Sequence, residues 1–470
     1  MRIRNRALLC VGVFALLLVY VPAACAAGAS ATVEKNTVWE GKVAVEGTVT
    51  VRKGVTLTLN PGTVVSFAKG GGLICEGVLI AKGSKDAPIR FLSAGKQSSP
   101  GEWEGVRFTE GSTGSILSRC VILGAAAVEI YGTGIEIGNC EIVKGKIGVV
   151  VGPGSNPKVV GNTIGEMSGG GVRCASGSTP WIEKNVLRSC GPFGISGDRS
   201  AAPLVRENEI SGCERGIAFY GTIPPVEGNV FRKNEVGVSA TMTGNRQILR
   251  GNRFEGNRIG LLCEQFSEPL VERNLFSGNG EALVCLRSSN PLVRNNGIVG
   301  NDNGIVAGNL SCPMILANEI RGNKKGIYLT YSSYATIRGN NIYENEIQVE
   351  LGLMSSDWER KTRNKPLRGG AAQRTYQASR GIPTSRQGEE EKEPLKRSVD
   401  ATGNWWGEKD TEEMERKGPE ANIGGLIDYY DAPAHPSEGY PGVYEQDRIR
   451  YEGWRKSRLP DAGVPKGSGS

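Results

Sequence analysis

Few side chains of this sequence have the chemistry of common catalytic groups, and those few are widely separated. The one histidine among the 470 residues is His435, near the C-terminus. Between residues 31 and 351 the only aspartates are Asp86, Asp198 and Asp302. Glycoside hydrolysis requires two carboxyl groups within about 5–9.5 Å of each other. The aspartates therefore give no sign of a catalytic pair.

Two pairs of glutamates lie close together in the sequence, Glu207 with Glu209 and Glu264 with Glu268. Neither pair recurs along the chain, and solvated surface positions explain both. The sequence favours a non-catalytic protein and leaves an enzyme open. An enzymatic version would be a polysaccharide lyase or a glycoside hydrolase with a non-standard site.

Metal and cofactor chemistry has no clear ligand set. The sequence contains no C-x-x-C-H motif and no cluster of histidines. The methionines beyond the N-terminal segment are scattered: Met167, Met242, Met314, Met354 and Met414. We therefore predict no metal site and no cofactor.

The elements that position the side chains are revealed by a repeated asparagine. Ten asparagines follow one another at intervals of 21 to 23 residues: Asn139, Asn162, Asn185, Asn208, Asn229, Asn252, Asn274, Asn296, Asn318 and Asn340. From Asn162 onward, an apolar residue lies two positions after each of them. Such self-similarity at a fixed period indicates a solenoid. We expect these residues to adopt left-handed turn conformations and to hydrogen-bond along the stack, rather than to bind sugar.

Each repeat between residues 115 and 351 contains three short apolar strands and three turns, as one coil of a parallel β-helix requires. The predicted fold is all-β, a parallel β-helix of about 14–16 coils that occupies residues 28–351. The strand pattern resumes in residues 399–432, which we assign to the last coil and a C-terminal cap. Within the cap, residues 411–416 are a possible helix and residues 422–428 a closing strand.

Cysteines replace asparagine at some equivalent positions. A second column, five residues after the first, contains Asn234, Asn257, Asn279, Asn301, Asn323 and Asn345. Cys190 and Cys213 take this position in earlier repeats, and Cys263 and Cys285 share another column. Adjacent coils bring each pair within disulfide reach, but parallel side chains make the S–S torsion awkward. We expect stacked thiols packed as small apolar groups, and the disulfide state stays open.

The N-terminus has the pattern of a secretory signal. Residues 1–27 contain a basic start, an apolar run and the Ala24-Cys25-Ala26 cleavage pattern. This predicts an exported protein, periplasmic or at the cell surface, without a transmembrane segment in the mature chain. Lipid attachment at Cys25 is the alternative, although Pro22 stands where such sites usually have leucine.

Two other segments depart from the repeat. Residues 352–398 are rich in charge and poor in aliphatic side chains, which predicts a disordered insertion. A basic arm for an acidic partner is the alternative for this insertion. Residues 433–470 are rich in Pro, Gly and charge, and predict a flexible tail.

The asparagine ladder, the Gly-Ile/Val strand that follows it and the segment Val399-Asp-Ala-Thr-Gly-Asn-Trp-Trp-Gly407 resemble right-handed parallel β-helix repeat proteins. Within them, the sequence is most similar to the exported group with carbohydrate-binding and sugar-hydrolase (CASH-type) and NosD-like repeats. The resemblance implies a right-handed coil. It leaves function open, because this group contains polysaccharide-degrading enzymes, adhesins and maturation factors for metalloenzymes.

Exposed aromatic side chains are the candidate ligand-binding residues. Tyr328, Tyr331 and Tyr334 belong to one coil, and Phe219 and Tyr220 to another. Aromatic faces on a flat sheet can stack on sugar rings, although scattered surface tyrosines are the simpler explanation. Trp405 and Trp406 are expected to plug the end of the core.

The sequence thus favours an exported, non-catalytic scaffold that binds a polysaccharide or an envelope protein. The alternatives are a polysaccharide lyase or hydrolase, and a NosD-like accessory factor in the maturation of an exported metalloenzyme. The formal charge of +7 is small and dispersed, which argues against nucleic acid as a partner.

Overall fold

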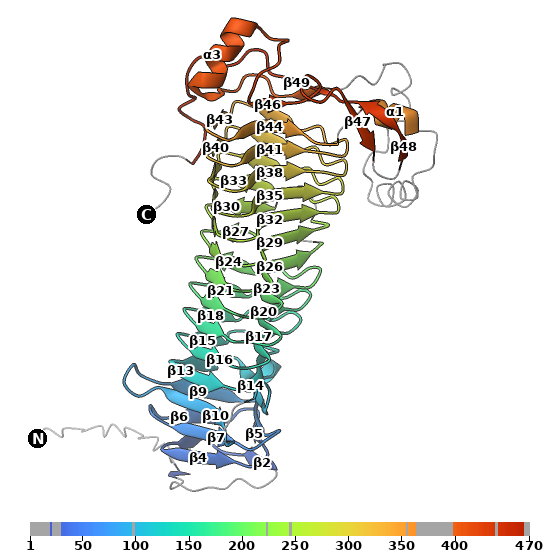
Figure 1. The fold of residues 1–470 in the computed structure, drawn as a ribbon. Helices are drawn as coiled ribbons and strands as arrows, with labels where there is room; N and C mark the ends of the chain where they lie inside the picture. The colour runs from blue at the N-terminus through green and yellow to red at the C-terminus, as the bar shows by residue number, and fades with distance from the viewer. Residues whose placement is uncertain are drawn as a thin grey trace, which may run out of the picture.

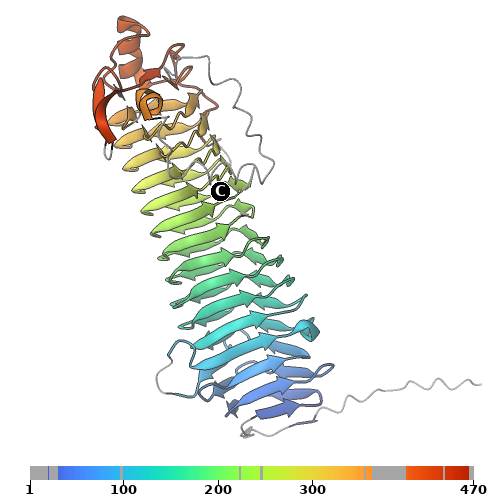
Figure 2. The ribbon, with the colours of Figure 1, turned by 90° about the vertical axis from the view of Figure 1, so that its right-hand side faces the viewer.

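The chain forms a tall parallel β-helix in a computed structural model (Figure 1). The structure describes residues 19–20, 30–95, 99–221, 224–243, 247–353, 356–362, 398–437 and 440–464. Most of the predicted signal segment and residues 363–397 of the predicted insertion therefore lie outside the described residues. Seen from the side, successive coils lie above one another as nearly parallel rungs (Figure 2).

Sheet A is 17-stranded, and neighbouring strands in it are parallel. In stacking order its strands are β1 (Val19–Tyr20), β3 (Thr37–Trp39), β6 (Thr56–Leu59), β9 (Val78–Lys82), β12 (Ile116–Ser118), β15 (Glu136–Gly138), β18 (Lys158–Val160), β21 (Trp181–Glu183), β24 (Leu204–Arg206), β27 (Val226–Glu227), β30 (Ile248–Arg250), β33 (Leu270–Glu272), β36 (Leu292–Arg294), β39 (Met314–Leu316), β42 (Thr336–Arg338), β45 (Ser398–Asp400) and β49 (Arg448–Arg450).

Sheet B is 14-stranded and also parallel. Its strands are β4 (Lys42–Val45), β7 (Val64–Phe67), β10 (Ile89–Ser93), β13 (Cys120–Leu123), β16 (Glu141–Val143), β19 (Thr163–Gly165), β22 (Val186–Arg188), β25 (Glu209–Ser211), β28 (Val230–Arg232), β31 (Arg253–Glu255), β34 (Leu275–Ser277), β37 (Gly297–Val299), β40 (Glu319–Arg321) and β43 (Asn341–Tyr343).

Sheet C is 16-stranded and parallel. Its strands are β2 (Ser30–Val33), β5 (Thr48–Val51), β8 (Gly72–Cys75), β11 (Trp103–Phe108), β14 (Ala125–Ile130), β17 (Ile147–Val151), β20 (Gly170–Cys174), β23 (Phe193–Gly197), β26 (Arg215–Tyr220), β29 (Val236–Thr241), β32 (Ile259–Glu264), β35 (Glu281–Leu286), β38 (Asn303–Ala307), β41 (Lys325–Leu329), β44 (Ile347–Leu351) and β46 (Leu426–Ile427). One strand from each sheet makes a coil, and the 14 strands of sheet B agree with the predicted number of coils.

The core is a continuous column of inward side chains from the three sheets. Phe231, Phe254 and Phe276 occupy the same place in successive coils, and their rings stack at centroid distances of 4.9 and 4.5 Å. Each is fully buried. Because an isolated coil would leave such rings in water, each coil depends on its neighbours.

The first asparagine column is a hydrogen-bonded ladder inside the stack. The Oδ1 atom of Asn296 accepts from the backbone N–H of Asn274 at 2.9 Å and from its Nδ2 at 3.0 Å. The Nδ2 atom of Asn274 also donates to the backbone carbonyl of Leu249. The same pattern holds from Asn162 to Asn340, and every one of these amides is buried. The prediction of amides bonded along the stack is confirmed.

Two details of the predicted ladder are wrong. The left-handed residue is the one before each ladder asparagine, for example Lys184, Arg273 and Ala317, so the asparagine side chain can turn inward. Asn139 itself has the left-handed conformation, with φ of 52°, so it lies one position before the rung and is not part of the ladder. Its neighbour Cys140 is the rung, because the Cys140 N–H donates to Asn162 Oδ1 at 2.9 Å.

The ladder continues beyond residues 363–397. Asn404 accepts hydrogen bonds from the N–H and the Nδ2 of Asn340, at 2.8 and 3.0 Å. The backbone of Trp405 next to it extends sheet B by a bridge to Asn341. The coil therefore resumes with β45 (Ser398–Asp400).

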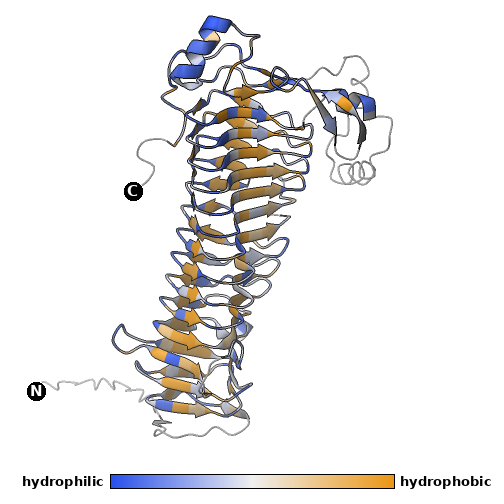
Figure 3. Cartoon of the chain, in the orientation of Figure 1, coloured by the Kyte–Doolittle hydropathy of each residue, from blue (hydrophilic) through white to orange (hydrophobic). Residues whose placement is uncertain are grey.

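The second column forms a similar ladder at the next corner. It runs from Asn234 to Asn345, and Cys213 donates its backbone N–H to Asn234 Oδ1 at 3.0 Å. The last amide, Asn345, donates to Gln348 Oε1 at 2.7 Å, and Gln348 Nε2 donates to Asp410 Oδ2 at 2.9 Å. Asp410 belongs to helix α3 (Gly407–Lys417), which covers this end of the stack (Figure 1). Most of α3 is hydrophilic, in contrast to the strands below it (Figure 3).

The sequence predicts a disordered insertion over residues 352–398. The part of this segment that the structure describes is in contrast partly regular. It includes helix α1 (Ser356–Thr362), and the Ser356 N–H donates to Asp447 Oδ2 at 2.8 Å. Near this helix, β47 (Ala434–Ser437) and β48 (Tyr440–Glu445) form an antiparallel pair. Contacts with the buried Asp447 hold the start of the segment in place.

The prediction of a flexible tail over residues 433–470 is also wrong for most of that segment. After β47, β48 and β49, residues 455–464 fold back along the stack and form what we call the strap. The Leu459 N–H donates to Asn341 Oδ1, and Asn341 Nδ2 donates to the Leu459 carbonyl, at 2.8 and 2.9 Å. Further along, Arg458 pairs with the buried Glu319 at 2.6 Å, and the Gly463 N–H donates to the Ala317 carbonyl. The strap therefore has specific partners in several coils.

The ladder gives a direct stability prediction. Replacing Asn296 by Ala leaves the Asn274 N–H buried without its acceptor. It also removes the hydrogen bonds that the side-chain amide of Asn296 donates. We expect a loss of about 3 kcal/mol, since each buried unpaired group costs about 1–3 kcal/mol. Urea unfolding followed by circular dichroism measures it. Asn303→Ala, on the outer face of sheet C and outside both ladders, is the control, and equal losses in the two variants would contradict the role of the ladder.

Candidate functional site

The outer face of sheet A carries a continuous apolar stripe. Strand register places seven side chains of successive coils in one column: Trp181, Leu204, Pro225, Ile248, Leu270, Leu292 and Met314. Trp181 is 40% and Met314 48% exposed, and Pro225 is also exposed. With about 4.8 Å between strands, the stripe is about 29 Å long.

A ladder of alternating charge lies beside this stripe. Two residues along each strand, the outward side chains are Glu183, Arg206, Glu227, Arg250, Glu272 and Arg294. Arg206 pairs with Glu183 at 2.9 Å, and Arg294 pairs with Glu272 at 2.7 Å. Burial opposes ionisation of Glu272, but hydrogen bonds from Arg294 and Arg250 hold the pKa of its carboxyl below the ordinary value. The charges on this face are therefore largely paired within the protein.

The aromatic residues predicted to bind a ligand do not form one surface. Tyr220 is 43% and Tyr331 50% exposed. Tyr328 is half-buried on the outer face of sheet C, with the Lys325 ammonium 4.6 Å from its ring centre. Tyr334 is half-buried, and its hydroxyl donates to Asp447 Oδ2 at 2.9 Å.

Phe219 points the other way. It is 3% exposed and belongs to the core, because the strand alternation that exposes Tyr220 turns its neighbour inward. The expectation that Phe219 contacts a ligand is therefore wrong. Trp406 is in the core at the end of the stack, as predicted.

Sheet C has a smaller apolar cluster on its outer face. Val236, Ile259, Val284 and Val306 pack together there, with Leu262, Leu286 and Tyr328 around them. All four central residues are buried. Since they already cover one another, this cluster offers less exposed apolar surface than the stripe on sheet A.

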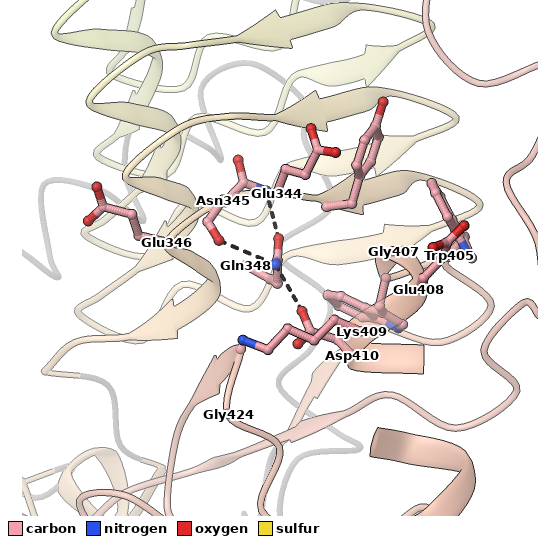
Figure 4. A pocket seen from close by; sticks show the side chains of 13 residues that line it. Glu344, Asn345, Glu346, Gln348, Trp405, Gly407, Glu408, Lys409, Asp410 and Gly424 are labelled. Carbon is pink, nitrogen blue, oxygen red and sulfur yellow. Dashed lines mark hydrogen bonds between the residues drawn. The ribbon is translucent and has the colours of Figure 1, made fainter. Parts of the chain in front are cut away.

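A pocket of about 660 Å³ lies between the last coil and the cap (Figure 4). Tyr343, Glu344, Asn345, Glu346 and Gln348 line it from the coil. The cap contributes Trp405, Trp406, Gly407, Glu408, Lys409, Asp410, Gly424 and Gly425. Figure 4 shows the hydrogen bonds that connect Asn345, Gln348 and Asp410 across the pocket.

Asp410 is the buried ionisable group of this pocket, with 4% of its surface exposed. Burial raises the pKa of its carboxyl, against the hydrogen bond from Gln348 and the charge of Lys409, which favour the ionised form. The charge of Glu413 adds to the increase in pKa. The pocket thus keeps a carboxyl group at low solvent exposure.

The predicted cysteine pairs are stacked in the core. Cys263 lies opposite Cys285 in neighbouring strands, and both are buried and unbridged. Cys190 and Cys213 are also buried and unbridged. Burial raises the pKa of the Cys285 thiol, and a hydrogen bond with Cys263 adds to it. These groups are therefore apolar packing elements, as expected.

The apolar stripe was not predicted from the sequence, although the spacing of its residues carries a signal for it. Its members lie four residues before successive ladder asparagines, and the alternating charges lie two residues before them. The pocket had no such signal, because its walls come from segments about 60 residues apart that are joined only by the fold.

Two family models that match parts of the chain agree with this architecture. Residues 224–407 match the family described as periplasmic copper-binding protein (NosD), and residues 104–254 match the family described as right-handed β-helix region. No curated protein matches the sequence. A solved structure, that of the Dettilon tailspike protein (gp208), is similar with 15% identity and a TM-score of 0.35. That similarity covers 63% of this chain and 62% of the tailspike chain, less than two thirds of its length.

The sheets and the repeat matches together define the class: the chain is a right-handed parallel β-helix repeat protein. Within this class, residues 224–407 have NosD-like repeats. Among the described residues, no helix has the length and apolar character needed to cross a membrane.

The NosD family is described as copper-binding, and the side chains of this chain that could bind copper are dispersed. In the described part of the chain, no three side chains of His, Cys, Asp or Glu converge as a metal site. Met167 and Met414 are buried in the core, whereas Met314 belongs to the exposed stripe. Copper requires soft or imidazole donors in one place, and these residues do not provide it.

The buried carboxyl of the pocket predicts a pH dependence. A carboxyl whose pKa is raised by folding stabilises the fold while protonated, and that contribution is lost as the pH rises through the raised pKa. Asp410→Asn should therefore gain in melting temperature relative to the parent protein as the pH increases from 4 to 7. Glu412→Gln, at an exposed position of α3, should show no such trend. A difference between Asp410→Asn and the parent that does not change with pH would contradict the burial effect.

Proposed function

We propose that the protein is an exported, non-catalytic scaffold that docks a protein partner along the outer face of sheet A. The apolar stripe from Trp181 to Met314 is the observation on which this rests. Exposed apolar surface of this continuity is characteristic of interaction sites. Most of its members are aliphatic, and aliphatic side chains suit the apolar surface of a protein better than a sugar ring.

The charge ladder supports a protein partner with a largely apolar contact surface. Glu183 and Glu272 are already paired with arginines and have little exposed side chain. A partner can cover them without supplying opposite charges, so the usual cost of burying an unpaired carboxylate is small. The stripe is narrow, and a standard interface buries about 800 Å² on each partner. We therefore expect reversible binding in which a few side chains, Trp181 among them, contribute most.

Export is part of this proposal. The basic start, the apolar run and the cleavage pattern of residues 1–27 support it, as does the periplasmic description of the family that matches residues 224–407. The same match favours a second candidate, an accessory role in the maturation of an exported metalloenzyme. In that case the docked partner is a component of the maturation system. The identity of the partner therefore distinguishes the scaffold role from the accessory role.

The mass of the secreted chain tests export. Expression in a bacterial host with a secretion pathway should give a product that has lost about 27 residues, as measured by intact-protein mass spectrometry of the periplasmic fraction. Retention of the full 470 residues would contradict export. Cleavage before Cys25 with an added lipid mass would instead replace the soluble form with an anchored one.

Photo-crosslinking from the stripe tests docking. A photoreactive amino acid at Leu292 should give a defined adduct with another envelope protein, while the same group at Val230, on the outer face of sheet B, should give none. Leu270→Glu should then lower the affinity of the purified pair at least tenfold, because it places an unpaired charge in the apolar contact.

The control variant is Val230→Glu, which introduces the same negative charge on the outer face of sheet B. It should leave the affinity for the partner unchanged. Equal adducts at positions 292 and 230 would contradict a specific face. If the adduct contains only a second copy of the chain, this face mediates self-association and does not dock another protein.

A further inference from the structure

The pocket between the last coil and the cap has a composition that the scaffold role does not use. One wall is aromatic: the rings of Tyr343 and Trp405 lie 5.0 Å apart, tilted by 48°. The Tyr343 hydroxyl donates to Glu319 Oε1 at 2.6 Å, which fixes this ring. The pocket therefore has a preformed aromatic wall that does not depend on a ligand for its position.

The cap provides hydrogen-bond donors on the other side. Residues Gly407 to Asp410 are the first turn of α3, where backbone N–H groups have no partner within the helix. The residue before the helix, Trp406, gives no side-chain cap to them. Trp406 also lines the pocket, and in the described part of the chain its buried indole N–H has no hydrogen-bond acceptor.

Acceptors lie among the same residues. Asp410 and Gln348 form the buried part, and Glu344, Glu346 and Glu408 are exposed. Lys409 is the one basic side chain among the residues that line the pocket. Three exposed glutamates against one lysine make the entrance negative, which disfavours anionic ligands.

Aromatic surface beside many separate donors and acceptors is suited to a ligand that has apolar ring faces and several hydroxyl groups. We propose that this pocket binds a short neutral saccharide, with a ring against Tyr343 and Trp405 and its hydroxyl groups on Asp410, Gln348 and the start of α3. The volume of about 660 Å³ is within the range of small-molecule sites, about 300–1,000 Å³. This site is separate from the stripe on sheet A and goes beyond the docking function.

Binding is tested with the whole mature chain against an array of oligosaccharides that includes neutral, amino and uronic-acid sugars, followed by calorimetric titration of the best ligand. Neutral saccharides should bind and uronic acids should not. Gly424→Phe should lower the affinity at least tenfold by filling the pocket. A Cβ atom at Gly424 has only Glu413 Oε2 nearby, at 3.7 Å, so the first atom of a side chain fits there without a clash.

Glu412→Phe is the matched control, because it adds the same ring to an exposed position of α3 outside the pocket. It should bind the saccharide like the parent protein, and so should Leu270→Glu on sheet A. Unchanged melting temperatures show that each variant is folded. The proposal is overturned if no neutral saccharide binds, if uronic acids bind in preference, or if Gly424→Phe leaves the affinity unchanged. If docking at sheet A fails while saccharide binding is intact, the proposed docking function is contradicted and the saccharide site is not.

Discussion

The buried amide ladder is the interaction on which the rest of this structure depends. Every asparagine from Asn185 to Asn340 accepts two hydrogen bonds from the preceding rung, one from the main chain and one from the side chain. A turn that points its backbone N–H groups into an apolar core would otherwise leave them unpaired, at a cost of about 1–3 kcal/mol for each group. By supplying acceptors at a fixed place in every coil, the ladder fixes the register of all three sheets. It also explains why the stripe and the charge ladder are straight columns.

A fixed register separates the roles of inside and outside. Inward positions hold apolar side chains or amides with partners in the neighbouring coils, so they have little freedom to vary in chemistry. Outward positions are constrained only by the strands beside them, which is why Trp181, Pro225 and Met314 can occupy one column. Distinctive surface chemistry in this molecule is therefore found on the outer faces and at the end of the stack, where the repeat stops.

Most of the fold was predictable from the sequence, because each coil repeats the same local rule. The period, the three strands per coil and the return of the last coil at Asn404 all follow from the spacing of Asn and apolar residues. The rung at Cys140 was missed, since the neighbouring Asn139 has the expected residue type but lies one position away. The strap was also missed. Its contacts with Asn341 and Glu319 join segments more than 100 residues apart, and the composition of residues 455–464 resembles that of an unstructured end. The pocket had no local signal for the same reason.

The strap has a consequence for the way the stack opens. In a simple solenoid each coil contacts only its neighbours, so the end coil can detach alone. Here the segment from Arg455 to Gly463 bonds to Asn404, Asn341 and Ala317 in turn. Opening of the last coil thus requires release of contacts further down, and the final coils become one cooperative unit in native-state hydrogen exchange. Fraying is then expected to begin at the opposite end, where β2 and β4 form the edge of the described stack.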